Sequence, residues 1–419
     1  MTRMGVFMIL QKHIRGRWSF RFSAGLVLAL FLFGLAGCSS DTPVTSEVLA
    51  DYGTYGASFA RKIALDYPLR GPYTPEEKAV AGILSTGFSN LGYKPVTDTF
   101  TVTDDKGVAT SSQNVSVTVP GTGFKIQDTK TGEIRTVRRQ VVIGAHYDTP
   151  FSVPVVDIAT GNPVKPSAGA SYDESVAAAK LGYDGINDNA SGIGAVMALA
   201  NEMAGKTYGY DVVIVAFGAG TAGQAGARRF VETMTPAQVS ATDAMYCVEA
   251  IFAGDKLYAS AGLNSLGLDK AGVSEKIYEK RRKLYEATDV AIENDLASLG
   301  FDLLTNQSSL EVDLNGDKIP DVYREVTNKV SDFTPFDKAG IACVYIESFD
   351  YAYDTLEAMK DSRNTGMAAF GGQMRNSPQD SYKFLFEVIT DQERLQERTN
   401  ITAFLLLESI KKGNWEAMP

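Results

Sequence analysis

The sequence predicts an α/β domain in which helices cover both faces of a mostly parallel β-sheet. Short apolar runs alternate along the chain with longer amphipathic segments, the pattern of buried strands and helices in such a domain. The composition, 44% hydrophobic and 21% charged over 419 residues, is typical of a globular protein with a large core. No domain boundary is evident within residues 71–415, so we expect them to form one α/β domain.

The individual elements carry recognisable start and stop signals. Residues 46–68 have helical periodicity. A second helix is expected at 74–92, where Thr74 can cap the first turn, Pro75 suits the first helical position and Gly92 ends the helix. The remaining elements are expected, in chain order, as strands at 93–104, 139–149, 211–219, 244–252 and 340–347 and helices at 188–205, 274–300 and 396–412.

Residues 1–37 have the features of a lipoprotein signal peptide. A basic segment, "KHIRGRWSFRF", precedes a short apolar run that ends at "LAGC", which makes Cys38 the expected site of lipidation. An uncleaved membrane anchor is the alternative, but the apolar run is short for a stable span. Residues 38–70 then form a polar tether and an amino-terminal helix. In both cases we expect an extracytoplasmic protein held at a membrane by this segment.

The charge of the chain excludes one class of partner. The net charge is -10, and residues 1–37 contain five basic residues and no acidic ones, so the rest of the chain has 35 basic against 50 acidic residues. Nucleic-acid binding needs clustered lysine and arginine, so we expect no nucleic-acid partner. Beyond Cys38 only Cys247 and Cys343 remain, both in apolar strand-like runs, and buried free thiols are favoured over a disulfide.

The polar residues that could carry chemistry follow the expected strands. Ligands in such a sheet bind beyond the carboxyl ends of the strands, where the chain has "AHYD", "GAGT", "CVEA" and "YIES". His146 is the one histidine after residue 37, and Asp148 can orient its imidazole in a carboxylate–histidine–metal arrangement. Asp188 precedes a helix start, where an acid taken alone is most simply a cap.

Five sequence blocks taken together resemble a known family. In order they are "VVIGAHYDT", "GINDNASGIGAVMALA", "VIVAFGAGTAGQAGARRFV", "VEAIFAGDKLYASAG" and "SDFTPFDKAGIACVYIES". They resemble the di-zinc aminopeptidases, metallopeptidase family twenty-eight, whose relatives include glutaminyl cyclases and transferrin-receptor-like proteins. The resemblance covers roughly residues 75–412. It implies a mixed sheet flanked by helices, in agreement with the pattern of elements.

The resemblance also implies roles for particular residues. In the family two zinc ions share one aspartate, and a separate glutamate takes the proton of the attacking water. His146 matches the first histidine ligand, Asp148 its orienting carboxylate and Asp188 the bridging aspartate. Glu249 falls where the family has an aspartate ligand. One zinc site is therefore complete if glutamate can replace aspartate.

The rest of the family's site is missing from this sequence. Gly220 stands at the position of the base glutamate, and Thr221 at that of a ligand glutamate. Asn376 stands where the last histidine ligand is expected, and Phe333 replaces a histidine of an "SDH" pattern. A neutral hydroxyl and a neutral amide are poor zinc ligands, so we expect at most one zinc ion.

These departures leave three interpretations open. The favoured one is a pseudopeptidase, an exported lipoprotein that keeps the fold to bind a peptide or another small polar ligand. The alternative is an active metallo-exopeptidase with one metal and a base from elsewhere, for which Asp332 and Glu347 are candidates. The third is a cyclase-like activity. It needs only one zinc ion, but it also needs an acidic residue that carries the proton.

A separate segment, "DLNGDKIPD" at 313–321, has the oxygen spacing of a calcium loop. The candidate ligands are Asp313, Asn315, Asp317 and Asp321. Position six, where such loops have glycine, is Lys318, and an ordinary polar turn would have the same composition. Calcium binding and a polar turn are therefore both retained as interpretations.

Overall fold

The computed structural model describes residues 52–103, 107–150, 182–266, 275–299, 303–305, 310–312, 318, 321–323, 325–352 and 358–412. Contacts divide the chain into Met1–Pro43 and Val44–Pro419, and every described residue belongs to the second unit. The expected signal peptide and Cys38 lie outside the described residues. Among the helices that the structure describes, none is long and apolar enough to cross a membrane.

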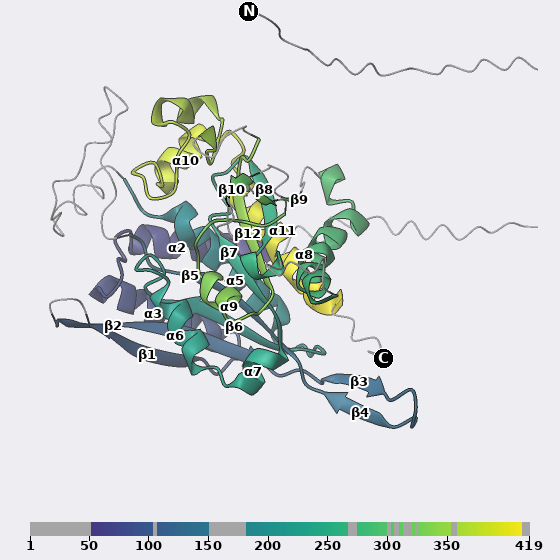
Figure 1. Ribbon diagram of the computed structural model, residues 1–419. Helices are drawn as coiled ribbons and strands as arrows, with labels where there is room; N and C mark the ends of the chain where they lie inside the picture. Colours follow the sequence, from purple (N-terminus) through teal and green to yellow (C-terminus); the bar gives the residue numbers. More distant parts are fainter. Residues whose placement is uncertain are drawn as a thin grey trace, which may run out of the picture. The chain divides into compact units, whose positions relative to one another are not determined.

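The centre of the second unit is a mixed sheet of eight strands (Figure 1). In spatial order they are β1 (Val96–Thr103), β2 (Ala109–Val119), β6 (Asp211–Phe217), β5 (Gln140–His146), β7 (Thr242–Glu249), β12 (Cys343–Phe349), β8 (Lys256–Ala261) and β9 (Leu303–Thr305). The four central strands β6, β5, β7 and β12 run parallel, and β2 and β8 flank them antiparallel. The predicted α/β class with a mixed, mostly parallel sheet is confirmed.

Helices cover both faces of this sheet (Figure 1). One face carries α2 (Tyr52–Asp66), α3 (Pro75–Asn90), α5 (Gly192–Met203), α8 (Glu275–Glu293) and α11 (Arg394–Lys412). The other carries α6 (Ala225–Thr233), α7 (Pro236–Ala241) and α9 (Thr334–Lys338). Within β5, Val141 and Ile143 pack into the first core and Val142 into the second, because successive side chains of a strand point to opposite faces.

The structure confirms the predicted start of one helix and corrects that of another. The Thr74 side chain caps α3 by accepting a hydrogen bond from the Glu77 backbone N–H at 3.2 Å, as predicted. The helix expected from residue 188 instead begins at Gly192, after the irregular turn η1 (Ile186–Ser191). The Asn189 side chain explains the delay: it bonds the Val248 carbonyl at 3.0 Å and the Ala250 N–H at 3.0 Å, which ties η1 to the end of β7.

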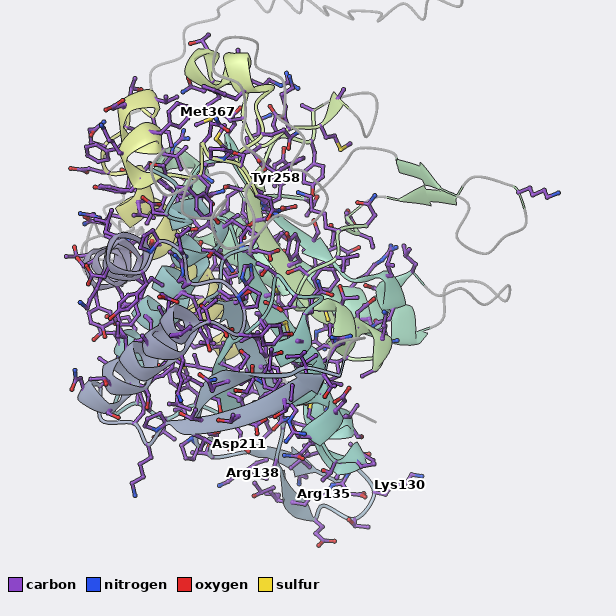
Figure 2. All side chains as sticks on the ribbon, turned by 90° about the vertical axis from the view of Figure 1, so that its left-hand side faces the viewer. Lys130, Arg135, Arg138, Asp211, Tyr258 and Met367 are labelled. Atoms are coloured by element: carbon purple, nitrogen blue, oxygen red, sulfur yellow. The ribbon has the colours of Figure 1, made fainter. Side chains whose placement is uncertain are left out.

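Some elements had no clear sequence signal. The hairpin of β3 (Phe124–Gln127) and β4 (Ile134–Val137) extends away from the main sheet (Figure 1), and Arg138 Nε anchors its base to Asp211 Oδ2 at 3.1 Å (Figure 2). Cys247 and Cys343 are buried free thiols, as predicted. The remaining described elements are η2 (Leu263–Ser265), η3 (Leu296–Leu299), β10 (Leu310–Val312), β11 (Asp321–Tyr323), η5 (Thr365–Phe370) and α10 (Tyr382–Val388).

Candidate metal centre

Three ligand-type side chains meet at the carboxyl ends of the parallel strands. His146 is the last residue of β5, Glu249 the last of β7, and Asp188 lies in η1 between them. One ligand atom from each residue lies within 4.8 Å of the other two, and all three residues are buried. His146 Nε2 is 3.3 Å from Asp188 Oδ1 and 3.2 Å from Glu249 Oε1.

This cluster fits a zinc ion. Imidazole nitrogen and carboxylate oxygen are ligands that zinc prefers, and three protein ligands leave the open position of a catalytic-type site. Asp188 Oδ1 is buried and makes no hydrogen bond with a described residue, although His146 Nε2 faces it. A buried carboxylate oxygen left in this way favours a cation as its partner.

Asp148 lies behind His146 and can orient its ring. On the side of the imidazole opposite Asp188 and Glu249, His146 Nδ1 lies 3.1 Å from the backbone carbonyl oxygen of Asp148 and 3.4 Å from its Oδ1. Asp148 is itself fully buried and accepts hydrogen bonds from the backbone N–H groups of Gly220 at 2.7 Å and Thr221 at 3.0 Å. A carboxylate fixed in this way holds the imidazole in position for a metal.

The turn after β6 is directed at Asp148. The Thr221 hydroxyl donates to Asp148 Oδ2 at 2.5 Å, so it serves the orienting carboxylate. A Cβ atom added at Gly220 would lie 2.3 Å from the Cβ of His146, closer than real contacts allow. There is therefore no space for a side chain at position 220. A glutamate there would require the backbone of the turn to move.

Buried polar residues outside the family's ligand positions hold this turn in place. Glu77 Oε1 accepts hydrogen bonds from the Ala219 N–H and from the Ser112 hydroxyl, both at 2.7 Å. Asn114 Oδ1 accepts from the Gly218 N–H at 3.2 Å. Burial, aided by the charge of Asp148, raises the pKa of Glu77 to about 7. Sequence reasoning missed these residues. The polar run "SSQN" inside a strand was the one signal for Ser112 and Asn114.

The metal-ligand side chains influence one another's protonation. Burial alone would lower the pKa of His146, but the nearby carboxylates of Asp148, Asp188 and Glu249 raise it well above its usual value. Burial would raise the pKa of Glu249, but His146 and the charge of Arg375 lower it to about 2. In the metal-free protein these carboxylates thus favour the charged form of the His146 imidazole, and a bound metal ion would supply the positive charge instead.

The other predicted positions divide into two groups. Asn376 is exposed, with φ of +54°, and Phe333 is buried against Tyr345 with ring centroids 5.2 Å apart. Neither can supply the imidazole of the family's second site. Asp313, Asn315 and Asp317 of the calcium-loop motif lie outside the described residues, and Asp321 is described only through its backbone in β11.

The two alternative acids lie in different environments. Glu347, near the end of β12, accepts hydrogen bonds from Lys329 Nζ at 2.7 Å and Arg375 Nη2 at 2.6 Å on Oε2 and from the Tyr351 hydroxyl on Oε1. Asp332 is buried, and neither of its carboxylate oxygens has a hydrogen-bond partner among the described residues. Burial raises the pKa of Asp332 to about 8, with further contributions from the charges of Glu249, Asp148 and Asp188 against the opposing effect of His146.

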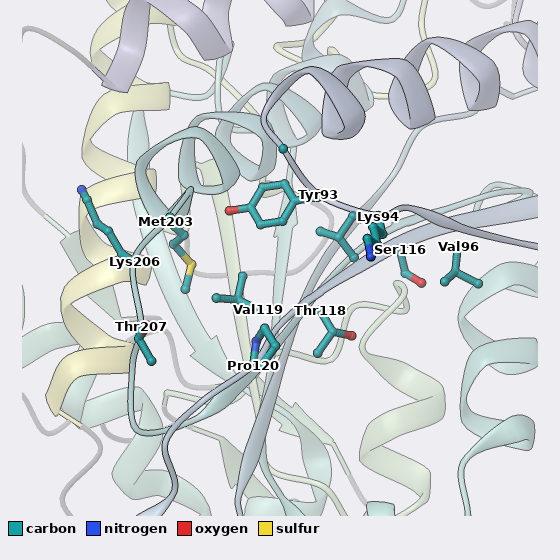
Figure 3. Close-up of a pocket in the computed structure, with 13 residues that line it drawn as sticks. Tyr93, Lys94, Val96, Ser116, Thr118, Val119, Pro120, Met203, Lys206 and Thr207 are labelled. Atoms are coloured by element: carbon teal, nitrogen blue, oxygen red, sulfur yellow. The ribbon is translucent and has the colours of Figure 1, made fainter.

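A pocket on another part of the domain contains none of the candidate metal ligands. This pocket of about 640 Å³ is lined by residues that include Tyr93, Lys94, Ser116, Thr118 and Lys206 (Figure 3). These residues follow α3, belong to β2 or follow α5, and none of the pocket's lining residues is a metal-ligand candidate. The donor set, and not pocket size, therefore identifies the site.

Comparison with known proteins agrees with the fold and identifies the family. The chain is 23% identical over 360 residues to the alkaline phosphatase isozyme conversion protein of Escherichia coli (strain K12), covering 86% of this chain and 90% of that protein. Its fold is similar to BSAP, a zinc aminopeptidase from Bacillus subtilis, with a TM-score of 0.53, 14% identity and coverage of 88% and 97%. It is equally similar to a Porphyromonas gingivalis glutaminyl cyclase, with a TM-score of 0.52, 14% identity and coverage of 87% and 99%. Residues 129–371, more than half of the chain, match Peptidase family M28, and the chain therefore belongs to that family.

Proposed function

We propose that this protein is a single-zinc member of family M28 that lacks the di-zinc aminopeptidase reaction and serves as a binding module for peptides or other small polar ligands. The observation that carries the proposal is the turn after β6. Its position 220 is a glycine with no space for a side chain, and its Thr221 hydroxyl donates to Asp148. The positions that supply the family's base and a second metal ligand therefore serve to support His146.

The remaining residues can hold a metal and a ligand. His146, Asp188 and Glu249 would hold zinc, which when bound supplies a Lewis acid that polarises a carbonyl oxygen. Asp148 keeps the imidazole in place. The missing base alone removes a contribution of about 10²–10⁴-fold to a hydrolytic rate. Binding without turnover is the result that this set of groups supports.

Metal analysis and an activity panel test the proposal together. Purified protein should contain no more than one zinc ion per chain, and a panel of aminoacyl-chromophore substrates with added zinc should give no turnover. His146→Ala serves as the control for contaminating peptidases. Two tightly bound zinc ions, or turnover that survives purification and disappears in His146→Ala, would overturn the proposal.

A single-metal exopeptidase or cyclase is the second candidate, and Asp332 is the observation that favours it. Its buried carboxyl group, with both oxygens unpartnered among the described residues and a pKa of about 8, has the properties of a proton carrier near neutral pH. If this candidate is correct, Asp332→Asn abolishes turnover and leaves the zinc content unchanged. Turnover that Asp332→Asn does not affect would remove it.

We also propose that the protein is exported and anchored to a membrane by lipidation at Cys38. The basic segment, the short apolar run and "LAGC" support this. Cys38→Ala should release the protein from membranes or block its processing. Unchanged fractionation of the variant, with residues 1–37 retained on the wild-type protein, would contradict it.

Weak calcium binding by the 313–321 segment is a further proposal, supported by its four oxygen donors and opposed by the charge of Lys318. Calorimetric calcium titration of wild type and Asp317→Ala tests it. The wild type should bind calcium and the variant should not. Equal titration of both proteins, or none in either, would rule it out.

A further inference from the structure

A smaller pocket adjoins the metal centre. Its volume is about 340 Å³, and its walls include Tyr345, Lys329 and Arg375. Tyr345 and Arg375 also contact the centre: the Tyr345 hydroxyl donates to Glu249 Oε2 at 2.7 Å, and Arg375 Nη1 lies 4.0 Å from the same oxygen. The pocket is therefore separated from a candidate metal ligand by a single layer of side chains.

Aromatic rings form much of the remaining wall. Phe349 and Tyr351 line the pocket, and their ring centroids are 4.7 Å apart. Tyr258, labelled in Figure 2, supports them from behind, because its ring packs edge-on against Tyr351 with centroids 4.9 Å apart. These rings give the pocket a rigid apolar side suited to the aliphatic part of a ligand.

The two cations of the pocket have donors to spare. Lys329 Nζ donates to Glu347 Oε2 at 2.7 Å and lies 3.4 Å from the centre of the Phe349 ring, but an ammonium group has three N–H donors. Arg375 donates to the Tyr345 hydroxyl at 2.9 Å and to Glu347 Oε2 at 2.6 Å. Its Nε atom is buried and makes no hydrogen bond with a described residue, although Asp361 Oδ1 lies 3.8 Å away.

The acidic groups nearby are already engaged. Asp361 Oδ2 accepts hydrogen bonds from the backbone N–H groups of Met374 at 2.6 Å and Arg375 at 3.1 Å. Glu347 is fully buried and accepts hydrogen bonds from Lys329, Arg375 and Tyr351. These carboxylates are thus already hydrogen-bonded, whereas Lys329 donates to Glu347 with one of its three N–H groups and Arg375 Nε has no acceptor among the described residues. A ligand that suits such a pocket has a negatively charged hydrogen-bond acceptor attached to a short aliphatic chain.

We propose that this pocket binds a carboxylate of a peptide ligand whose amino end lies at the metal centre. The proposal rests on the proposed function, because it places the amino end of the bound ligand at the metal centre. Two sources of carboxylate fit the pocket: an acidic first side chain, or the carboxyl terminus of a dipeptide. In both, Lys329 and Arg375 face the carboxylate, and the aromatic rings contact the methylene groups before it.

Calorimetry on the zinc-loaded full chain tests the pocket with matched peptides. Glutamyl-alanine amide is compared with glutaminyl-alanine amide, and alanyl-alanine with its amide, so that each pair differs by one carboxylate. We expect at least one carboxylate peptide to bind about tenfold more tightly than its neutral partner, the effect of one charge-assisted contact. The pair that shows the preference identifies the source.

Variants decide whether the pocket causes that preference. Lys329→Met should lower the affinity for the preferred carboxylate peptide about tenfold and leave its neutral partner unchanged, and Lys329→Arg should keep the preference. Lys206→Met, at the remote pocket of Figure 3, is the control, and melting temperature and zinc content report folding for each variant.

The inference and the proposed function can fail separately. Equal affinities within both pairs, no binding of any peptide, or equal losses for both members of a pair in Lys329→Met would mean that Lys329 and Arg375 only neutralise Glu347, which overturns the inference. Aminopeptidase turnover together with a carboxylate preference would overturn the proposed function and leave the pocket's role intact.

Discussion

The loop after β5 and the turn after β6 lie side by side at one end of the sheet, yet they differ in chemistry. The loop carries His146 and Asp148, placed as a metal ligand and its orienting carboxylate. The turn carries Gly220 and Thr221, whose N–H groups and hydroxyl all donate to Asp148. The loop after β5 thus carries a candidate metal ligand, whereas the turn after β6 carries none. The fold alone therefore does not determine how many metal ions a member of the family can hold.

His146→Ala should produce the largest difference between the two regions. Removing one of three protein ligands should lower zinc affinity by at least about 10³-fold, whereas Thr221→Val removes one hydrogen bond to Asp148 and should cost no more than about tenfold. Chelator competition measures both values. Equal zinc loss in the two variants would mean that the turn supplies a ligand.

Asp332→Asn should stabilise the metal-free protein in a pH-dependent way. The pKa of Asp332 in the folded protein is about 8, so its ionisation opposes folding as pH rises above the ordinary aspartate range. The gain should be near zero at pH 4 and reach the order of several kcal/mol at pH 8, since each unit of pKa shift corresponds to about 1.4 kcal/mol. Denaturant unfolding at both pH values checks this. A gain independent of pH would show that Asp332 does not titrate as described.

Asp148→Asn separates orientation of the imidazole from direct binding of the metal. Such supporting carboxylates are typically worth about 10–100-fold in metal affinity, and we expect a loss in that range with the zinc count unchanged. Elemental analysis at saturating zinc, combined with chelator competition, tests it. A loss as large as that of His146→Ala would place Asp148 among the ligands.

Gly220→Ala should destabilise the protein, and Gly82→Ala should not. The added methyl at position 220 meets His146, a contact that should cost about 1–3 kcal/mol. Gly82 lies within α3 with no atom within 4 Å of an added Cβ, so alanine there should stabilise the helix by about 0.5–1 kcal/mol. Thermal unfolding of the two variants gives the comparison. Stabilisation by alanine at both positions would show that the turn is open enough to accept a side chain.

The sequence alone was sufficient for the fold class and for most of the metal cluster. The central parallel strands are buried on both faces, so they appear as continuous apolar runs, and the capping signals of α3 depend only on neighbouring residues. His146 could be named as a candidate from its place at the end of an expected strand, whereas Asp188 and Glu249 were assigned as ligands through the resemblance to the family. Their assembly in space follows from the strand order β6–β5–β7, which no local pattern specifies.

Only the tertiary structure decided what surrounds that cluster. Glu77 and Asn114 approach the turn after β6 from α3 and β2, more than a hundred residues earlier in the chain, so their hydrogen bonds leave no periodic trace in the sequence. In the sequence, Thr221 and Gly220 were recognisable only as residues that replace the carboxylates of the family. The tertiary structure shows instead that their N–H and O–H groups donate to Asp148 and that position 220 has no space for a side chain. The physical reason is that secondary structure depends on nearby residues, whereas hydrogen bonds between buried polar groups depend on which distant segments the folded chain brings together.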